Sequence, residues 1–386
     1  MEVCSQKLVS TVERRFGFAH VLPVAQGRSA ELMLALARVR PGMVVPNNLL
    51  FPTTRYHQER AGATLAEIPV AESLDPVSDF PFKGNLDVAK LEALIREHGN
   101  ERIPYVYVEA ATNASGGHPV SMENIRCVHE LARRNRIAVV VDGCRLLENA
   151  WHIRERELRQ GARRLPDLVL EFCSHADVCP ASASKDFWID KGGFIATRDP
   201  DLFRELQDLV FLSGDGLSVG DKAELQSAIE ETFTHEFHVG RRVDAAAQLW
   251  RALRKAGVPV VCPAGGHAVF LDLRALHQHL PEEHCPDRAF LVEFYRESGI
   301  LGGTHVLTDS QRRRGLKMVR LALPLGGYPR GTVGRIARDV ARVWGRRSQI
   351  EGLRLLSAPP NRSGEFLGRY EPVVSKLGGM PLGDRP

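Results

Sequence analysis

Apolar positions in the first 250 residues alternate between short continuous runs and stretches in which apolar residues lie three or four apart. The short runs predict strands at 20–24, 66–70, 103–109, 137–142, 177–180 and 193–197. The spaced stretches, such as 87–98 and 122–135, predict amphipathic helices. Strands that alternate with helices are typical of a parallel sheet with crossover helices. The pattern therefore predicts an α/β fold.

The pattern changes towards the C-terminus. Residues 223–255 are predicted to be helical, with a break near Gly240, and 258–273 to form a strand, a Gly-Gly turn and a second strand. A further helix is predicted at 331–344, and the Gly- and Pro-rich tail 359–386 is expected to pack as a loop or to fray.

Length and composition bound the domain organisation and the partners. The 386 residues exceed the size of about 250–300 residues at which single cores stop growing. We expect a large domain at 1–255, whose N-terminal segment can pack with the small domain, and a small α+β domain at 256–386. The net charge of +4 is spread along the chain, which argues against a nucleic-acid partner.

Cysteine usage and hydropathy point to a soluble protein of the cytoplasm. The seven cysteines are irregularly spaced, which is typical of reduced thiols. Cys173, His175 and Cys179 fit no standard zinc spacing, so no metal site is expected. The chain has no run of 18 apolar residues and no secretion signal at its start, so neither a membrane nor an export pathway is predicted.

Polar residues follow several predicted strands, where ligands bind in doubly wound sheets. They include a lysine, an aspartate and a Gln-Gly-Arg turn ahead of a predicted helix. The set comprises Gln26, Gly27, Arg28, Asn113, Asp142, Arg145, Ser182 and Lys185.

This set matches what pyridoxal phosphate (PLP) needs from a protein: a lysine, an acid at its ring nitrogen and donors for its phosphate. Lys185 stands among small residues that leave room for a cofactor, and the carboxylate of Asp142 would oppose the charge of a protonated ring. The helix that follows Gly27 offers free backbone N–H groups to a phosphate. Each feature has an ordinary alternative: a surface lysine, a helix N-cap and a plain βα turn.

Taken together, motifs along nearly the whole chain resemble the β-eliminating lyases, the group of tyrosine phenol-lyase and tryptophanase. The matching stretches lie at 16–31, 51–59, 74–87, 112–126, 141–151, 182–194, 265–270, 319–324 and 369–372. The resemblance implies a fold-type-I PLP enzyme, in which a large domain with a mainly parallel, seven-stranded type of sheet joins a smaller α+β domain.

Roles for single residues follow from the same resemblance. It implies that Lys185 forms the Schiff base with the cofactor and later moves the α-proton of the substrate. Asp142 would pair with the ring nitrogen, and Arg320 would bind the substrate carboxylate through its bidentate fork. Asn113 and Arg145 would contact the ring's 3-oxygen and Phe51 would stack on the ring, while the phosphate would be held by Gln26, Gly27, Arg28 and Ser182. For Phe51 and Arg320 the alternatives are core packing and a surface ion pair.

Several positions depart from the family pattern. Aligned on Phe16, the family tyrosine that protonates the leaving aromatic carbon would fall upstream of Met1. Ser184 replaces the first of two adjacent lysines, and Asp190 replaces an asparagine tied to a monovalent cation; both changes argue against a dependence on potassium.

Two further departures concern the side chain of the substrate. Pro52 replaces a threonine, and the arginine that grips the phenol hydroxyl is replaced near His305. Because a general acid must lie within hydrogen-bond reach of the leaving atom, phenol and indole are disfavoured as leaving groups.

The predicted function is a PLP-dependent lyase that removes the α-proton of an amino acid and eliminates a β-substituent, with a heteroatom leaving group favoured. Transamination, β-replacement or γ-elimination in a specialised pathway stays open, as does a non-catalytic relative of the family. A homodimer or homotetramer is expected because sites of this family lie at subunit interfaces. The sequence does not identify the substrate side chain, which depends on a few pocket contacts.

Overall fold

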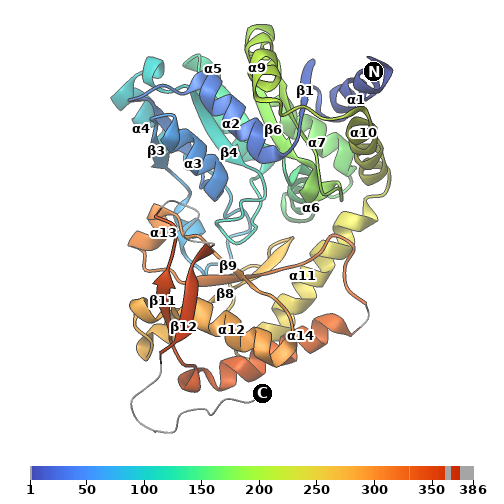
Figure 1. Ribbon diagram of the computed structural model, residues 1–386. Helices are drawn as coiled ribbons and strands as arrows, with labels where there is room; N and C mark the ends of the chain where they lie inside the picture. The colour runs from blue at the N-terminus through green and yellow to red at the C-terminus, as the bar shows by residue number, and fades with distance from the viewer. Residues whose placement is uncertain (1, 330, 361–366, 374–386) are drawn as a thin grey trace.

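A seven-stranded sheet forms the centre of the N-terminal part of the protein (Figure 1). The computed structural model describes residues 2–329, 331–360 and 367–373. The strand order is β1-β7-β6-β5-β4-β2-β3; β7 is antiparallel to both of its neighbours and all other pairs are parallel. The strands are β1 (His20–Val24), β2 (Val44–Asn47), β3 (Thr64–Glu67), β4 (Tyr105–Glu109), β5 (Ala138–Asp142), β6 (Val178–Ser182) and β7 (Gly193–Thr197). The predicted α/β class is confirmed.

Two strands of the sheet depart from the prediction. The prediction at 66–70 lies too late, because β3 spans Thr64–Glu67. Strand β2 was not predicted at all, although all four of its residues are buried. It is short and contains Pro46, a residue that normally argues against a central strand because it cannot donate to the ladder.

Helices cover both faces of this sheet. The alternation of side chains along β5 shows the two sides, since Val139 and Val141 pack into one core while Val140 packs into the other. The face of Val140 is covered by α2 (Gly27–Arg38) and α9 (Pro200–Ser213). The opposite face is covered by α1 (Glu2–Phe16), α4 (Val88–His98), α5 (Met122–Arg134), α6 (Leu146–Arg156), α7 (Leu165–Ser174) and α10 (Val219–Thr234).

The C-terminal region has a core and small sheets of its own. The sheets are β8-β10-β9, from Ala268–Asp272, Met318–Ala322 and Gly303–Thr304, and β11-β12, from Leu353–Ser357 and Arg369–Pro372. Its helices are α12 (Pro286–Ser298), α13 (Asp309–Arg313) and α14 (Thr332–Gly345), and the remaining short helices of the chain are α3 (Pro52–Arg60) and α8 (Ala183–Asp186). Single 3-10 turns lie at Ala71–Leu74, Asn100–Arg102, Arg274–Gln278, Glu282–His284 and Arg347–Gln349.

Helix α11 (Phe237–Lys255) runs from the sheet into the C-terminal region (Figure 1). Its Val243 belongs to the core of the sheet, whereas Ala246 belongs to the C-terminal core. The predicted helical break lies at 235–236, between α10 and α11, rather than at Gly240, which stays inside α11. We propose that the two cores correspond to two domains that meet along this helix.

Helix α1 packs on α10 and α7, because Leu8 and Val12 enter the core of the sheet. Two expectations, for the second region and for the tail, are wrong. Only the second strand predicted within 258–273 forms; Val260 makes a single bridge with Leu271. The tail contributes strand β12, paired with β11, while 361–366 and 374–386 lie outside the described residues.

No helix in the described ranges is both long and apolar enough to cross a membrane.

Candidate active site

Asp142 ends β5 and is buried at the carboxyl edge of the sheet. Its Oδ1 accepts a hydrogen bond from the backbone N–H of Cys144 at 2.9 Å, which turns the chain away from the strand. Its Oδ2 lies 3.4 Å from the hydroxyl of Tyr107 on β4. The carboxyl group is therefore held in place while keeping capacity to accept a further hydrogen bond.

Lys185 lies in the short helix α8, directly after β6. Its Nζ donates to Oγ of Ser184 at 3.3 Å. Burial lowers the pKa of the Lys185 amine, and the positive charges of Arg145 and Arg320 lower it further. A larger fraction of this amine is consequently neutral at physiological pH than for an exposed lysine.

The N-terminus of α2 comes very close to the end of β6. Gln26, the N-cap of α2, makes no side-chain cap hydrogen bond, so the first N–H groups of the helix are not capped by it. A Cβ on Gly27 would lie 2.6 Å from Cβ of Ser182, so only glycine permits this approach. Arg28 follows in the first turn, which makes the junction suitable for an anion.

Arg320 reaches the same edge from β10 of the C-terminal region. Its Nη1 donates to Oδ1 of Asn113 at 2.7 Å, while its buried Nε has no partner. The buried Nε of Arg145 has no partner either. Burial, together with the charge of Arg145, lowers the pKa of Arg320, so the two guanidinium groups lie close enough to repel each other.

A buried network that sequence reasoning did not identify supports these groups. Arg242 of α11 donates to Oε2 of Glu148 at 2.7 Å, to Oδ1 of Asp186 at 2.9 Å and to the backbone oxygen of Lys185 at 3.1 Å. His267 lies between Oε1 of Glu148, 2.7 Å from Nδ1, and Oδ1 of Asn113, 3.3 Å from Nε2. The network connects Lys185 to Asn113 through side chains that are buried from solvent.

Phe51 immediately precedes α3, in the extended conformation, with Pro52 at the first helical position. Two residues further on, the hydroxyl of Thr53 donates to Oε2 of Glu31 in α2 at 2.7 Å. Burial and the neighbouring Asp142 carboxylate raise the pKa of Glu31 to about 8. The start of α3 is thus attached to the helix that faces Asp142.

His305 is buried near Arg320, and its Nε2 lies 3.1 Å from Oε1 of Gln311. Burial lowers the pKa of His305 to about 4, so its ring is neutral at physiological pH. Gln311 in turn donates to the backbone oxygen of Ala114 at 2.6 Å.

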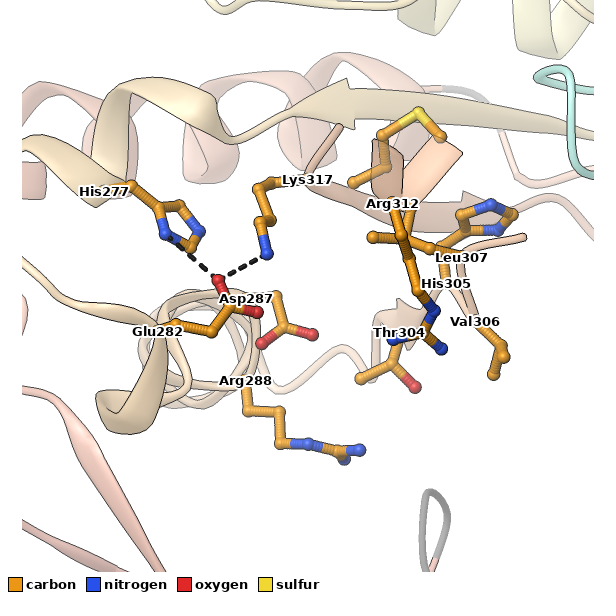
Figure 2. Close-up of a pocket in the computed structure, with 11 residues that line it drawn as sticks. His277, Glu282, Asp287, Arg288, Thr304, His305, Val306, Leu307, Arg312 and Lys317 are labelled. Atoms are coloured by element: carbon orange, nitrogen blue, oxygen red, sulfur yellow. Dashed lines mark hydrogen bonds and ion pairs between the residues drawn. The ribbon is translucent and has the colours of Figure 1, made fainter. Parts of the chain in front are cut away.

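His305 also lines a separate pocket of about 150 Å³ within the C-terminal region. Figure 2 shows Glu282 of this pocket between Lys317, with which it forms an ion pair, and His277, whose Nδ1 lies 3.5 Å from Oε2 of Glu282. The pocket is lined by none of Lys185, Asp142 and Arg320. It is therefore distinct from the cluster of polar residues around these three at the carboxyl edge of the central sheet.

The cluster fits pyridoxal phosphate by its own geometry. Two buried guanidinium Nε atoms lack partners, and the uncapped start of α2 lies against Ser182, which leaves donors for an oxygen-rich ligand. A partly neutral lysine and a buried carboxylate complete the groups that this cofactor requires. The sequence-predicted residues that the structure brings to this edge are Gln26, Gly27, Arg28, Asn113, Asp142, Arg145, Ser182, Lys185 and Arg320.

Comparison with known proteins shows the family. Residues 3–324 match the family described as beta-eliminating lyase, and the chain belongs to this family. It is 37% identical over 379 residues to tyrosine phenol-lyase of Pasteurella multocida, covering 95% of this chain and 82% of that protein. Tyrosine phenol-lyase of Nostoc punctiforme is 33% identical over 365 residues, covering 91% of this chain and 78% of that protein. The resemblance found in the sequence is confirmed, and the protein is a PLP-dependent lyase.

Solved structures share the fold at low sequence identity. Serine palmitoyltransferase from S. paucimobilis with a bound PLP–myriocin aldimine has a TM-score of 0.65 at 11% identity, covering 90% of this chain and 78% of that one. Threonine aldolase from Leishmania major has a TM-score of 0.62 at 16% identity, covering 89% of this chain and 90% of that one. The predicted fold type I is therefore confirmed.

Proposed function

We propose that Lys185, Asp142 and Arg320 are the catalytic residues of this lyase. The observation that supports this most is the meeting of all three at one sheet edge, with the Lys185 amine shifted towards its neutral form by burial and by Arg145. When bound, pyridoxal phosphate supplies an aldehyde that condenses with amines and a ring that accepts electrons. Asp142 would keep the ring nitrogen protonated by opposing its charge.

The other residues of the cluster would hold the cofactor. The first turn of α2, with Gly27 and Arg28, would bind the phosphate together with Ser182 and Gln26, since helix N-termini favour anions. Asn113 and Arg145 would contact the 3-oxygen of the ring. Phe51 would cover one face of the ring from the start of α3.

Lys185 and Arg320 would act on the substrate. The neutral amine of Lys185 would take the proton from the α-carbon of the amino acid. The guanidinium of Arg320 would bind the α-carboxylate through its planar fork, and its unpartnered Nε is available for this contact. Asn113, which accepts a hydrogen bond from Arg320 Nη1, would keep the fork in place.

For the leaving group we propose a heteroatom, such as the sulfur of an S-substituted cysteine. His305, near the expected site of an arginine that would grip a phenol hydroxyl, is neutral and already has Gln311 as a neighbour. Pro52, beside Phe51, has no hydroxyl to offer. A thiolate or halide leaves as a stable anion and needs no protonation of an aromatic carbon, which general acids accelerate by about 10²–10⁴-fold.

Release of phenol from tyrosine is the second candidate. It is supported by the 37% identity to a protein named tyrosine phenol-lyase. The two candidates differ in the atom that leaves the β-carbon, so they are separable by substrate alone.

The test compares substrates under one condition. Pyruvate release is followed with S-methylcysteine, β-chloroalanine, tyrosine and tryptophan at saturating cofactor, with and without potassium. We expect the first two to turn over at least tenfold faster than the aromatic amino acids. A faster reaction with tyrosine would establish the second candidate instead, and keto-acid formation without loss of a β-substituent would indicate transamination.

We further propose a homodimer or homotetramer. Phe211 and Leu212, near the C-terminal end of α9, are 85% and 79% exposed, which is unusual for a surface that faces only water. Sedimentation of the holoenzyme tests the assembly, and an active monomer would contradict it.

A further inference from the structure

Glu109 occupies the same place on β4 that Asp142 occupies on β5. The two residues are register partners in neighbouring parallel strands, which lie about 4.8 Å apart in such sheets. Both side chains point to the face that carries Tyr105, Tyr107 and Val140, which is the face covered by α2. Each residue is only 4% exposed. A second buried carboxyl group therefore lies beside the one that we assign to the cofactor ring.

The hydrogen bonds of Glu109 are incomplete for a charged group. Its Oε1 accepts from the backbone N–H of Asn113 at 2.7 Å, but its buried Oε2 has no partner. A buried carboxylate oxygen without a donor is costly, whereas the protonated form carries an O–H that can donate to a neighbouring acceptor. Asp142, the register partner of Glu109, is the one charged residue of the adjacent strand β5.

The charges around Glu109 also favour its protonated, neutral form. Asp142 from β5 and Glu31 from α2 both face it, and burial and these two carboxyls raise the pKa of Glu109. The hydrogen bond from the Asn113 N–H and the positive charge of Arg145, which follows β5, lower the pKa of Glu109. On the other side Asn48, the residue after β2, contributes a neutral amide that bonds to the backbone N–H and C=O of Glu109 and not to its carboxyl group.

We propose that Glu109 is a positioning residue that holds a proton beside Asp142, so that a neutral carboxyl group donates to Asp142 and the negative charge stays on the residue facing the ring nitrogen. The inference rests on the proposed role of Asp142. In this role Glu109 makes no contact with the substrate. At neutral pH the negative charge of one carboxylate, Asp142, acts on the cofactor, and a second negative charge is added only when Glu109 loses its proton.

The first experiment observes the proton itself. Infrared spectra of the protein, with and without cofactor, are recorded at neutral pH for the wild type, for Glu109→Gln and for Glu31→Gln, because burial raises the pKa of Glu31 to about 8 as well. We expect protonated-carboxyl absorption from both glutamates: Glu109→Gln removes one component, and Glu31→Gln removes another while leaving the Glu109 component in place. Protonated-carboxyl absorption that Glu109→Gln leaves unchanged would overturn the proposal. Labelling of wild-type glutamate carboxyl groups with ¹³C assigns the band to glutamate independently of the variants.

The second experiment observes the effect on the cofactor. Glutamine imitates the neutral glutamic acid in shape and charge, so the absorbance of the bound cofactor should be the same in wild type and Glu109→Gln at neutral pH. The two spectra should separate only as the pH rises through about 8, where Glu109 ionises. Spectra that differ already at neutral pH, or that coincide throughout, would contradict the coupling. If Asp142 is not the ring partner, this experiment shows no separation while the infrared band without cofactor still reports the proton on Glu109.

Discussion

Arg320 and Asn113 are joined by a hydrogen bond of 2.7 Å, from the guanidinium Nη1 to the amide Oδ1, that connects the C-terminal sheet to the strand ends of the central sheet. The hydrogen bond therefore fixes the Arg320 guanidinium before any substrate arrives. Less side-chain order has to be gained on binding, which is how preorganised contacts contribute to affinity.

Replacing Arg320 with alanine should weaken substrate binding about ten- to a hundredfold, because a hydrogen-bonded charged contact contributes about 1.5–3 kcal/mol. Cofactor content should stay unchanged. Arg320→Lys should recover only part of the affinity, since lysine keeps the charge but lacks the fork. Substrate titrations and cofactor absorbance provide the two readouts, with the exposed Arg354→Ala as control. An equal loss of cofactor would point to a structural role.

Asp142→Asn should retain cofactor but slow removal of the α-proton by about 10²–10³-fold, because a neutral amide no longer opposes the charge of the ring. The rate of exchange of the substrate α-proton with deuterated solvent measures this step directly. Tyr107→Phe is the matched control, since its hydroxyl lies 3.4 Å from Asp142 and should contribute little. If both variants exchange the α-proton at the wild-type rate, Asp142 has another function.

Glu31 makes the stability of the protein depend on pH. Its pKa is raised from the ordinary range of a glutamate to about 8, chiefly by burial. A raised folded-state pKa means that the folded protein binds the proton more tightly than the unfolded chain does. The resulting stabilisation is complete below about pH 4 and is lost as the pH rises through about 8, with a slope of up to about 1.4 kcal/mol per pH unit.

Glu31→Gln should remove this contribution, so the variant should lose less stability than the wild type between pH 5 and about pH 8. Denaturant unfolding of the protein without cofactor at several pH values tests the prediction. Parallel curves for the two proteins would show that Glu31 titrates normally.

Gly27→Ala should reduce cofactor affinity. The added Cβ would lie 2.6 Å from Cβ of Ser182 and 3.0 Å from its backbone, which forces α2 away from β6. Overpacking of this kind costs about 1–3 kcal/mol, or about five- to a hundredfold in affinity. Gly216→Ala is the control, because nothing lies within 4 Å of its added Cβ. Cofactor titration should show a reduced affinity for Gly27→Ala only. Equal cofactor affinities of the two variants would exclude the close junction of α2 and β6.

The sequence was most informative where an apolar strand ends in a polar residue. Asp142 and Lys185 were predicted in this way, because β5 and β6 are strongly apolar and their ends are easy to recognise. The same rule also applies to Glu109 at the end of β4, but the residue assigned to the site after this strand was Asn113. Strand β2 escaped because it is short and contains Pro46.

The supporting network could not be predicted from local patterns. Glu148, Arg242 and His267 come from three separate elements, and each looks like an ordinary surface residue in the sequence. Their burial depends on how α6 and α11 pack together and on where the chain enters β8. Such buried charges are tolerated because they satisfy one another, which only the folded chain reveals.

Reductive trapping tests the central claim most directly, because it reports which lysine holds the cofactor. The protein is loaded with pyridoxal phosphate, reduced with borohydride and digested, and the labelled peptide is identified by mass spectrometry. We predict that the label lies on Lys185, and that Lys185→Ala carries none while Lys191→Ala, six residues away in the sequence and exposed, is labelled like the wild type. A label on another lysine, or no label after full incubation with cofactor, would contradict the assignment of the active site.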